Sequence, residues 1–330
     1  MKPKVKIFTL GGTIASASTG GKGVSPTLGA QALVDAVPQI ADVAEVEAET
    51  FRQLASPHIG YDDVIALSVE IEKSVANGAA GVVVTQGTDT LEETGFLLDR
   101  LVQLDAPVVL TGAMRNPTLP GADGPANMHH AVMVAASEAA RGFGAMIVFN
   151  DEIHAARYVR KSHTQSTATF TSQPIGPIGW IAENDVRVIA PPLGRYPVAR
   201  PAAEAMGKVA LLKVCMGDDG TLVQAVVDGG FDGLVIEATG GGHVTEIMAD
   251  MVVDAARQMP VILTSRTGGG EILRETYMFT GSEMYLQERG LIGGGWLEGP
   301  KARLLLALLI GNKASRAEIA GEFEAWHSPV

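Results

Sequence analysis

The chain has 330 residues, of which 46% are hydrophobic and 19% charged, and this size and composition allow two ordinary domains, each with its own core. Its formal net charge is −12, without any block of consecutive Lys or Arg, which argues against a surface that neutralises nucleic-acid phosphates or anionic lipid. Neither nucleic acid nor a membrane is therefore expected as a partner. The single cysteine, Cys215, excludes an internal disulfide and the Cys-rich metal motifs.

Basic residues occur near the N-terminus, but the apolar stretch behind them, residues 7–10, ends at Gly11. A secretory signal has a longer apolar region, so we expect none here. The most apolar run near the C-terminus, residues 304–310, is far shorter than a membrane span. The expected location is cytoplasmic, and a periplasmic location stays open if a signal peptide was removed.

Short β-branched runs alternate with longer stretches of Ala, Leu and Glu, a pattern typical of βα units on a buried parallel sheet. The strands predicted in the first half are residues 5–9, 81–85, 107–111 and 145–149. Three of them run directly into Gly and Thr. We therefore expect hydroxyl-bearing turns at the carboxyl ends of the strands, where open α/β sheets bind ligands.

A proline-rich segment begins at Pro191 and can sustain neither a helix nor a central strand. We interpret residues 191–207 as a linker between an N-terminal domain, residues 1–190, and a C-terminal domain, residues 208–330. The alternation resumes after the linker and predicts a smaller α/β domain. Its predicted strands are residues 208–214, 233–237 and 260–264.

Two strand-to-turn junctions, residues 9–15 and residues 85–94, combine glycine with a threonine hydroxyl. Glycine permits a sharp turn that leaves main-chain N–H groups exposed beside the hydroxyl, which is the geometry of a nucleophile next to an anion hole. The second junction also contains a capping-box pattern, Thr90 followed by Glu93, which predicts the start of a helix. Because helix capping explains many such turns, composition alone leaves the structural and catalytic interpretations open.

Nucleotide and metal motifs do not occur in this sequence. Neither junction has the Gly-x-Gly-x-x-Gly spacing of a dinucleotide site or the Gly-Lys-Ser/Thr ending of a P-loop. The densest histidine pair, His129 and His130, would point about a hundred degrees apart on a helix, unlike the i, i+4 pair that binds zinc. No metal and no organic cofactor are expected.

The two junctions together closely resemble the two signature motifs of bacterial-type L-asparaginases, members of the asparaginase/glutaminase family. Further similar segments follow in the family's order, so the resemblance spans nearly the whole chain. The similar segments are residues 11–15, 85–94, 111–115, 122–125, 150–151, Lys161 with 168–170, and 300–303. The resemblance implies a two-domain α/β fold, with a larger N-terminal, flavodoxin- or Rossmann-like, mostly parallel sheet and a smaller C-terminal α/β domain.

The resemblance also implies an amidohydrolase that converts L-asparagine to L-aspartate and ammonia, with L-glutamine as an expected side substrate. Carried over by position, it makes Thr13 the nucleophile and Thr88, Asp89 and Lys161 a second, threonine-acid-lysine group. Burial favours a neutral lysine, whereas an ionised Asp89 favours the ammonium form, so the protonation state of Lys161 stays open.

The same resemblance implies the residues that bind the substrate. Ser56 and Asp89 would hold its α-carboxylate and α-amino groups, and Thr88 and Ala113 would belong to the same site. Glu283 matches a glutamate that, in the family, reaches the site of a neighbouring subunit. The expected assembly is therefore a homotetramer, built as a dimer of dimers.

Three positions depart from the family: Gly23 near a loop position that often holds a tyrosine, Pro57 where Gln or Glu is common, and His243 where an asparagine is frequent. Substrate preference, affinity and loop closure therefore stay open. Two other functions are also open, an ammonia-supplying amidotransferase subunit and a non-catalytic amino-acid-binding protein. The lack of spare length and the acidic charge disfavour the first, and the presence of two threonines with a lysine disfavours the second.

Overall fold

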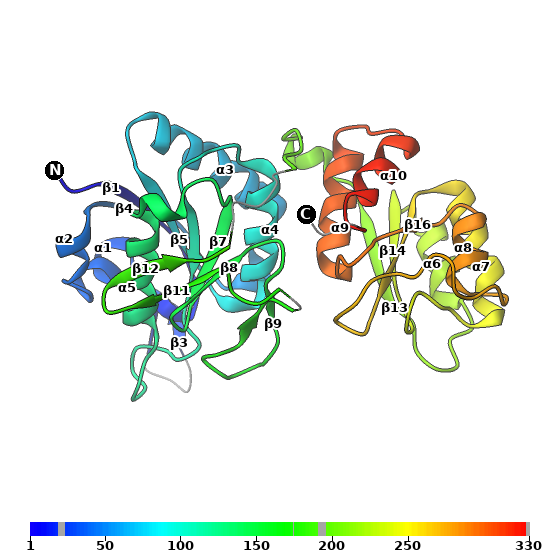
Figure 1. The fold of residues 1–330 in the computed structure, drawn as a ribbon, viewed down its shortest axis with the longest axis horizontal. Coiled ribbons are helices and arrows are strands. Elements are labelled where there is room, and N and C mark those ends of the chain that lie inside the picture. Colours follow the sequence, from blue (N-terminus) through cyan, green and yellow to red (C-terminus); the bar gives the residue numbers. More distant parts are fainter. Residues whose placement is uncertain (19–23, 174, 191–195, 328–330) are drawn as a thin grey trace. The chain divides into compact units, whose positions relative to one another are not determined.

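Two sheets, one in each unit of the chain, form the framework of the computed structural model (Figure 1). The structure describes residues 1–18, 24–173, 175–190 and 196–327. The chain divides into the units Met1–Pro197 and Val198–Val330, and the linker over residues 191–207 stays a prediction. Residues 191–195 of that range and Gly23 lie outside the described residues.

The N-terminal unit contains an eight-stranded sheet in the order β12-β11-β8-β7-β6-β5-β1-β4. The five strands from β4 to β7 are parallel, whereas β8, β11 and β12 extend the sheet in antiparallel pairs. All four strands predicted in the first half are present. The bounds are β1 (Lys4–Gly11), β4 (Glu45–Leu54), β5 (Gly81–Thr85), β6 (Val108–Thr111), β7 (Ala145–Phe149), β8 (Glu152–Ala155), β11 (Gly179–Ala182) and β12 (Asp185–Val188).

Helices cover both faces of this sheet, which explains why β5 and β7 are buried along their whole length and consist almost entirely of apolar residues. Two helices, α3 (Tyr61–Ala76) and α4 (Leu91–Leu101), pack together on one face (Figure 1). The other face is covered by α1 (Ala30–Asp35), α2 (Ile40–Val43) and α5 (Gly124–Ala135).

Short strands and 3-10 helices lie at the carboxyl edge of the sheet and in the loops around it. Two small antiparallel pairs form, one from β2 and β3 and one from β9 and β10. The bounds are β2 (Ser16–Ser18), β3 (Val24–Pro26), β9 (Arg160–Lys161), β10 (Phe170–Thr171), and the 3-10 helices η1 (Thr13–Ala15), η2 (Ser56–His58), η3 (Thr88–Thr90) and η4 (Glu138–Ala140).

The C-terminal unit contains a four-stranded parallel sheet in the order β13-β14-β15-β16. Three of these strands were predicted, whereas β16 was missed because two residues are too few to give a pattern. The bounds are β13 (Val209–Lys213), β14 (Gly233–Ala238), β15 (Val261–Ser265), β16 (Ile292–Gly293), η5 (Ala203–Ala205), α6 (Thr221–Asp228), α7 (Glu246–Gln258), α8 (Glu283–Glu288), α9 (Gly299–Gly311) and α10 (Arg316–Glu324).

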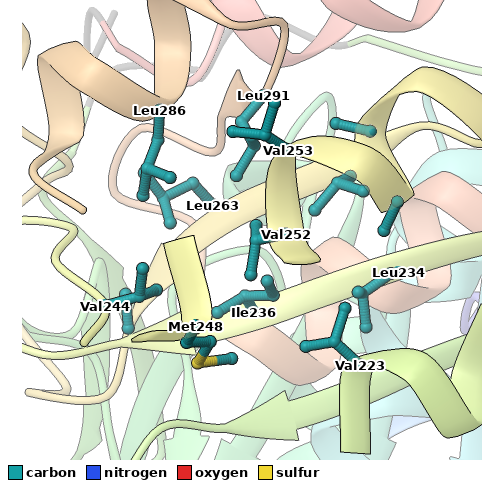
Figure 2. Close-up of a cluster of buried hydrophobic side chains, with 14 of the residues drawn as sticks. Val223, Leu234, Ile236, Val244, Met248, Val252, Val253, Leu263, Leu286 and Leu291 are labelled. Carbon is teal, nitrogen blue, oxygen red and sulfur yellow. The ribbon is translucent and has the colours of Figure 1, made fainter. Parts of the chain in front are cut away.

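The core of this unit lies between its sheet and the helices α6, α7 and α8 (Figure 2). Val252 of α7 is fully buried and belongs to the same cluster as Leu234 and Ile236 of β14. The two-unit arrangement, with its larger and smaller largely parallel sheets, confirms the predicted fold class. Within the described residues, no helix combines the length and apolarity needed to cross a membrane.

His154 of β8 is a buried histidine that ties the β9–β10 pair to the main sheet. Its side chain is 1% exposed, and its Nδ1 lies 2.9 Å from Oγ of Ser172, the residue directly after β10. Burial lowers the pKa of His154 to about 4 from its ordinary value of 6.5. Folding therefore favours the neutral ring.

We predict that this histidine makes the free energy of unfolding fall with acidification. Because the folded pKa is about 4 and the ordinary value is 6.5, the stabilisation is complete above pH 6.5 and is lost as the pH falls towards 4. The loss is about 3 kcal/mol at 1.36 kcal/mol per pKa unit. Urea unfolding of wild-type protein and of His154→Gln, which stays neutral, should give curves that diverge over this range, and parallel curves would contradict the prediction.

Candidate active site

The turns after β1 and β5 lie where the winding of the N-terminal sheet reverses. From β1 the chain moves outward to β4 and then returns past β1 to β5, and the helices that follow β1 and β5 pack on opposite faces. In open α/β sheets, ligands bind at the carboxyl ends of the strands beside such a reversal. Thr9 of β1 pairs with Thr85 of β5 at this edge, so the two threonine motifs begin side by side.

Glycine is required in these turns because their backbones touch. Gly12 has φ of 82°, and a Cβ atom there would lie 2.0 Å from the backbone nitrogen of Gly87. Likewise, a Cβ on Gly112, after β6, would lie 2.6 Å from the carbonyl oxygen of Gln86. No side chain fits at either distance, so glycine allows the three turns to pack against one another.

Thr13 is the first residue of η1, directly after the turn at Gly12. Its side chain is half-buried, and its hydroxyl makes no hydrogen bond within the described part of the chain. The turn itself is fixed, because Ser16 Oγ donates to the Gly12 carbonyl at 2.8 Å and the Gly12 N–H donates to the Leu54 carbonyl at 3.1 Å. The Thr13 hydroxyl is therefore presented by an ordered backbone.

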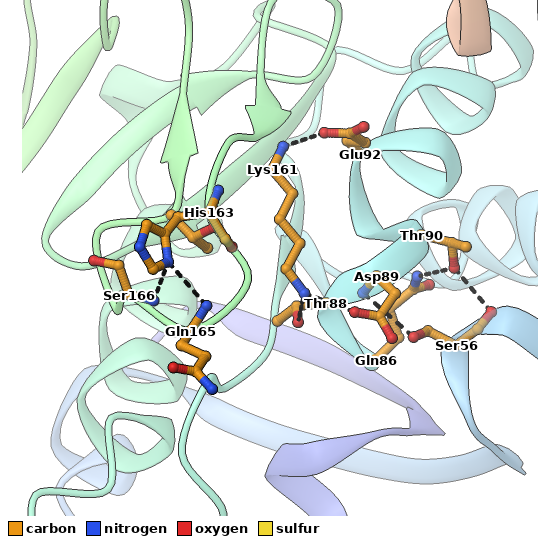
Figure 3. Close-up of polar contacts among 11 residues, drawn as sticks. Ser56, Gln86, Thr88, Asp89, Thr90, Glu92, Lys161, His163, Gln165 and Ser166 are labelled. Atoms are coloured by element: carbon orange, nitrogen blue, oxygen red, sulfur yellow. Dashed lines mark hydrogen bonds and ion pairs between the residues drawn. The ribbon is translucent and has the colours of Figure 1, made fainter.

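Thr88, Asp89 and Lys161 meet at the end of β5, although Lys161 follows 72 residues after Asp89 (Figure 3). Lys161 Nζ donates to Thr88 Oγ1 at 2.9 Å and to Asp89 Oδ1 at 2.6 Å. The Lys161 side chain is 14% exposed and that of Asp89 is 61% exposed. The lysine is thus largely enclosed, while the carboxylate still faces solvent.

Ser56 joins the same group from η2 and is buried. Its Oγ accepts from the Asp89 N–H at 3.3 Å. Thr90 directly precedes α4, as the sequence predicts. The predicted capping box is wrong, because the Thr90 hydroxyl makes no cap hydrogen bond and donates to the Ser56 carbonyl at 2.9 Å. A tertiary contact replaces the local cap and attaches the Ser56 loop to the start of α4 (Figure 3).

Ala113 lies in the third turn, after β6, and is buried. The turn is fixed by Asp123, whose carboxylate accepts from the N–H groups of Met114 at 2.9 Å and Arg115 at 2.8 Å. Ala113 and Ile14, the neighbour of Thr13, line one small apolar cavity of about 80 Å³. The structure therefore places Ala113 close to the turn that presents Thr13.

Glu92 is a residue that the sequence did not single out. Its Oε2 accepts a hydrogen bond from the backbone N–H of Lys161 (Figure 3). Nothing in the sequence reveals this contact, since an acidic residue in the first turn of a helix is ordinary.

Glu283 lies in the C-terminal unit, where its side chain is fully buried. Its Oε1 accepts from the N–H groups of Thr276 at 3.1 Å and Tyr277 at 2.7 Å, and its Oε2 lies 3.1 Å from His243 Nε2. Burial opposes its ionisation, but these hydrogen bonds outweigh burial and hold the pKa of Glu283 below its ordinary value. His243, the side-chain partner of this carboxylate, is half-buried, and its ring packs edge-on against the exposed Tyr277 and Phe279.

His129 and His130, the pair considered for metal binding, have ring centroids 5.7 Å apart. In the described ranges, no three His, Cys, Asp or Glu side chains gather closely enough to hold a metal ion.

Comparisons with known proteins cover both units. The model of the family described as "Asparaginase, N-terminal" matches residues 4–193, and that of the "Glutaminase/Asparaginase C-terminal domain" matches residues 208–323. The L-asparaginase of Bacillus licheniformis is 34% identical, over 94% of this chain and 97% of the relative. A probable L-asparaginase of Deinococcus radiodurans is 37% identical, over 97% of each chain.

A solved structure is similar to this chain over nearly its whole length. The crystal structure of the probable cytoplasmic L-asparaginase from Campylobacter jejuni superposes with a TM-score of 0.88 at 29% identity, covering 98% of this chain and 99% of that one. Both family models, the relatives and the two-unit fold lead to one conclusion. The chain belongs to the asparaginase family of amidohydrolases.

Proposed function

We propose that this chain hydrolyses the side-chain amide of L-asparagine to L-aspartate and ammonia, with Thr13 as the nucleophile. Relatives that are similar over almost their whole length are named L-asparaginases, which supports the substrate. The proposal depends most on one observation: a single lysine, Lys161, bonds both Thr88 and Asp89 beside the turn that presents Thr13. A binding protein has no need for a lysine bonded to a threonine hydroxyl in this way.

In the proposed reaction, Thr13 Oγ1 attacks the amide carbon of the substrate, and the hydroxyl proton passes to the departing nitrogen, which leaves as ammonia. Water then attacks the acyl-enzyme ester, releasing L-aspartate and returning a proton to Thr13. Main-chain N–H groups of the glycine turns would stabilise the oxyanion, each by about 3 kcal/mol. Lys161 would stabilise negative charge on Thr88 Oγ1 as that hydroxyl takes part in proton transfer.

Substrate binding is assigned to residues around this pair. Asp89 is 61% exposed beside Lys161, so its carboxylate could accept hydrogen bonds from an α-amino group. Ser56 would contribute its hydroxyl to the α-carboxylate, and Ala113 would form part of the wall. The cytoplasmic location expected from the short apolar stretch at the N-terminus stays a prediction. The Campylobacter jejuni protein is named cytoplasmic, whereas a relative from Haemophilus influenzae is named periplasmic.

Replacing either threonine with alanine should remove activity without unfolding the protein. Thr13→Ala and Thr88→Ala should each lower kcat by at least about a thousandfold, as losses of a reacting group do. Both threonines lie in short 3-10 helices after strands, Thr13 half-buried and Thr88 buried, and each substitution removes a hydroxyl rather than core packing. Thermal unfolding should change little, and Thr221→Ala, an exposed threonine of the other unit, is the matched control. Near-normal turnover by either variant would remove that threonine from the mechanism.

Ammonia release separates the two amide substrates. Purified protein should release ammonia from L-asparagine, and from L-glutamine about 10 to 200 times more slowly, since one methylene changes selectivity by about 1–3 kcal/mol. A coupled ammonia assay at matched substrate concentrations measures both rates. If neither amide releases ammonia, the proposed activity is refuted.

We further propose a homotetramer, a dimer of dimers in which the C-terminal unit of one subunit completes the site of another. The exposed residues Tyr277 and Phe279 pack against the ring of His243, and Met278 between them in the sequence is also exposed. Aromatic and Met residues are enriched at interface cores. Because Glu283 is fully buried behind His243, its contribution to a neighbouring site would be to orient that ring.

Mixing inactive subunits tests shared sites. Thr13→Ala chains and Glu283→Ala chains, each inactive alone, should recover roughly a quarter of wild-type activity after subunit exchange, because half of the pairs are mixed and each mixed pair has one intact site. Since Glu283→Ala leaves buried donors unpaired, Glu283→Gln is the milder second variant. Full activity in a monomer by light scattering, or proven exchange without recovery, would contradict shared sites.

A further inference from the structure

Lys161 lies on an element that is too short to fix it. The strands β9 and β10 have two residues each and pair through Lys161 with Phe170 and Arg160 with Thr171. An isolated pair of strands is at best marginally stable, and a lysine side chain has about 2 kcal/mol of rotamer entropy to lose on ordering. Other contacts must therefore hold Lys161 Nζ against Thr88.

Glu92 supplies one of these contacts, at the backbone of the lysine. The carboxylate accepts from the Lys161 N–H, while Thr88 and Asp89 accept from Nζ at the far end of the same side chain (Figure 3). Thr88, Asp89 and Glu92 all belong to one continuous segment, η3 and the first turn of α4. The backbone N–H and the Nζ of Lys161 are thus both bonded to one continuous segment. This segment fixes the distance between the Lys161 backbone and the Thr88 hydroxyl.

We propose that Glu92 is a positioning residue for Lys161, acting through the lysine backbone rather than on the substrate. The inference rests on the role of Lys161 in the proposed hydrolysis. For this role, the Glu92 side chain must be long enough to place an acceptor oxygen at the Lys161 N–H. A carboxylate in the first turn also favours the positive end of the helix dipole, but a shorter acid would serve that purpose equally well.

Two substitutions of Glu92 distinguish the effect of side-chain length from the effect of charge. Glu92→Gln keeps the length and an acceptor oxygen but loses the charge, whereas Glu92→Asp keeps the charge but is one methylene too short. We expect Glu92→Asp to lower kcat by about 10- to 100-fold, as small misplacements of reacting groups do. KM should stay within about threefold, because Ser56 is untouched and Asp89 is also held through its own N–H by Ser56. Glu92→Gln should stay within about threefold of wild type in both kcat and KM.

The controls address helix electrostatics and folding. Asp62→Asn removes an exposed acid from the first turn of α3 and should leave activity unchanged. Thermal unfolding is measured for every variant, and Glu92→Ala is the second variant if Glu92→Asp does not fold. Wild-type kcat in both shortened variants, or equal losses in Glu92→Gln and Glu92→Asp, would overturn the inference.

A Lys161→Ala background separates this inference from the proposed function. If Lys161→Ala keeps normal turnover, the role assigned to Lys161 in the proposed hydrolysis fails. If it loses turnover while Glu92→Asp does not, only the positioning role fails. If Lys161 takes part in hydrolysis and Glu92 positions it, adding Glu92→Asp to Lys161→Ala should lower the residual rate no further, because Glu92 acts only through the lysine. A further loss of more than about threefold would assign Glu92 a separate effect and overturn the inference.

Discussion

The contact between glycine backbones at the carboxyl edge of the N-terminal sheet is the constraint on which the rest of the site depends. Gly12 approaches Gly87, and Gly112 approaches the backbone of Gln86, at distances that no side chain could occupy. This packing brings the turns after β1, β5 and β6 together, so that residues far apart in the sequence share one edge. The reversal of winding between β1 and β5 supplies the place for it.

The lysine of the site comes from a distant part of the chain. Lys161 is held by a two-residue strand, by Glu92 at its backbone N–H, and by Thr88 and Asp89 at its Nζ. The pair of strands is itself tied to the main sheet, since Ser172 bonds the buried His154. A chain of contacts therefore runs from the core of the unit to one nitrogen atom, which limits its freedom before any substrate binds.

The buried acid of the C-terminal unit, Glu283, has a different role from the acids around Lys161. Glu283 is saturated by donors of its own unit, so its charge serves to fix the loop at Thr276 and Tyr277 and the ring of His243. A buried carboxylate with several hydrogen bonds is costly to disturb. These hydrogen bonds hold His243 and the backbone of Thr276 and Tyr277 in place, next to the surface that we propose for subunit contact.

The sequence alone determined most of the fold, because buried parallel strands require unbroken β-branched runs and turns in close contact require glycine. These local patterns predicted the start of α4, the two threonine turns and seven of the strands, namely β1, β5, β6, β7, β13, β14 and β15. They could not decide what each polar group bonds, as Thr90 illustrates: its pattern predicts a cap, yet its hydroxyl bonds Ser56. The family resemblance grouped Lys161 with Thr88 and Asp89, although no local pattern could do so. The contact of Glu92 and the burial of Glu283 were decided only by the tertiary structure, because each brings together parts of the chain that are far apart in the sequence.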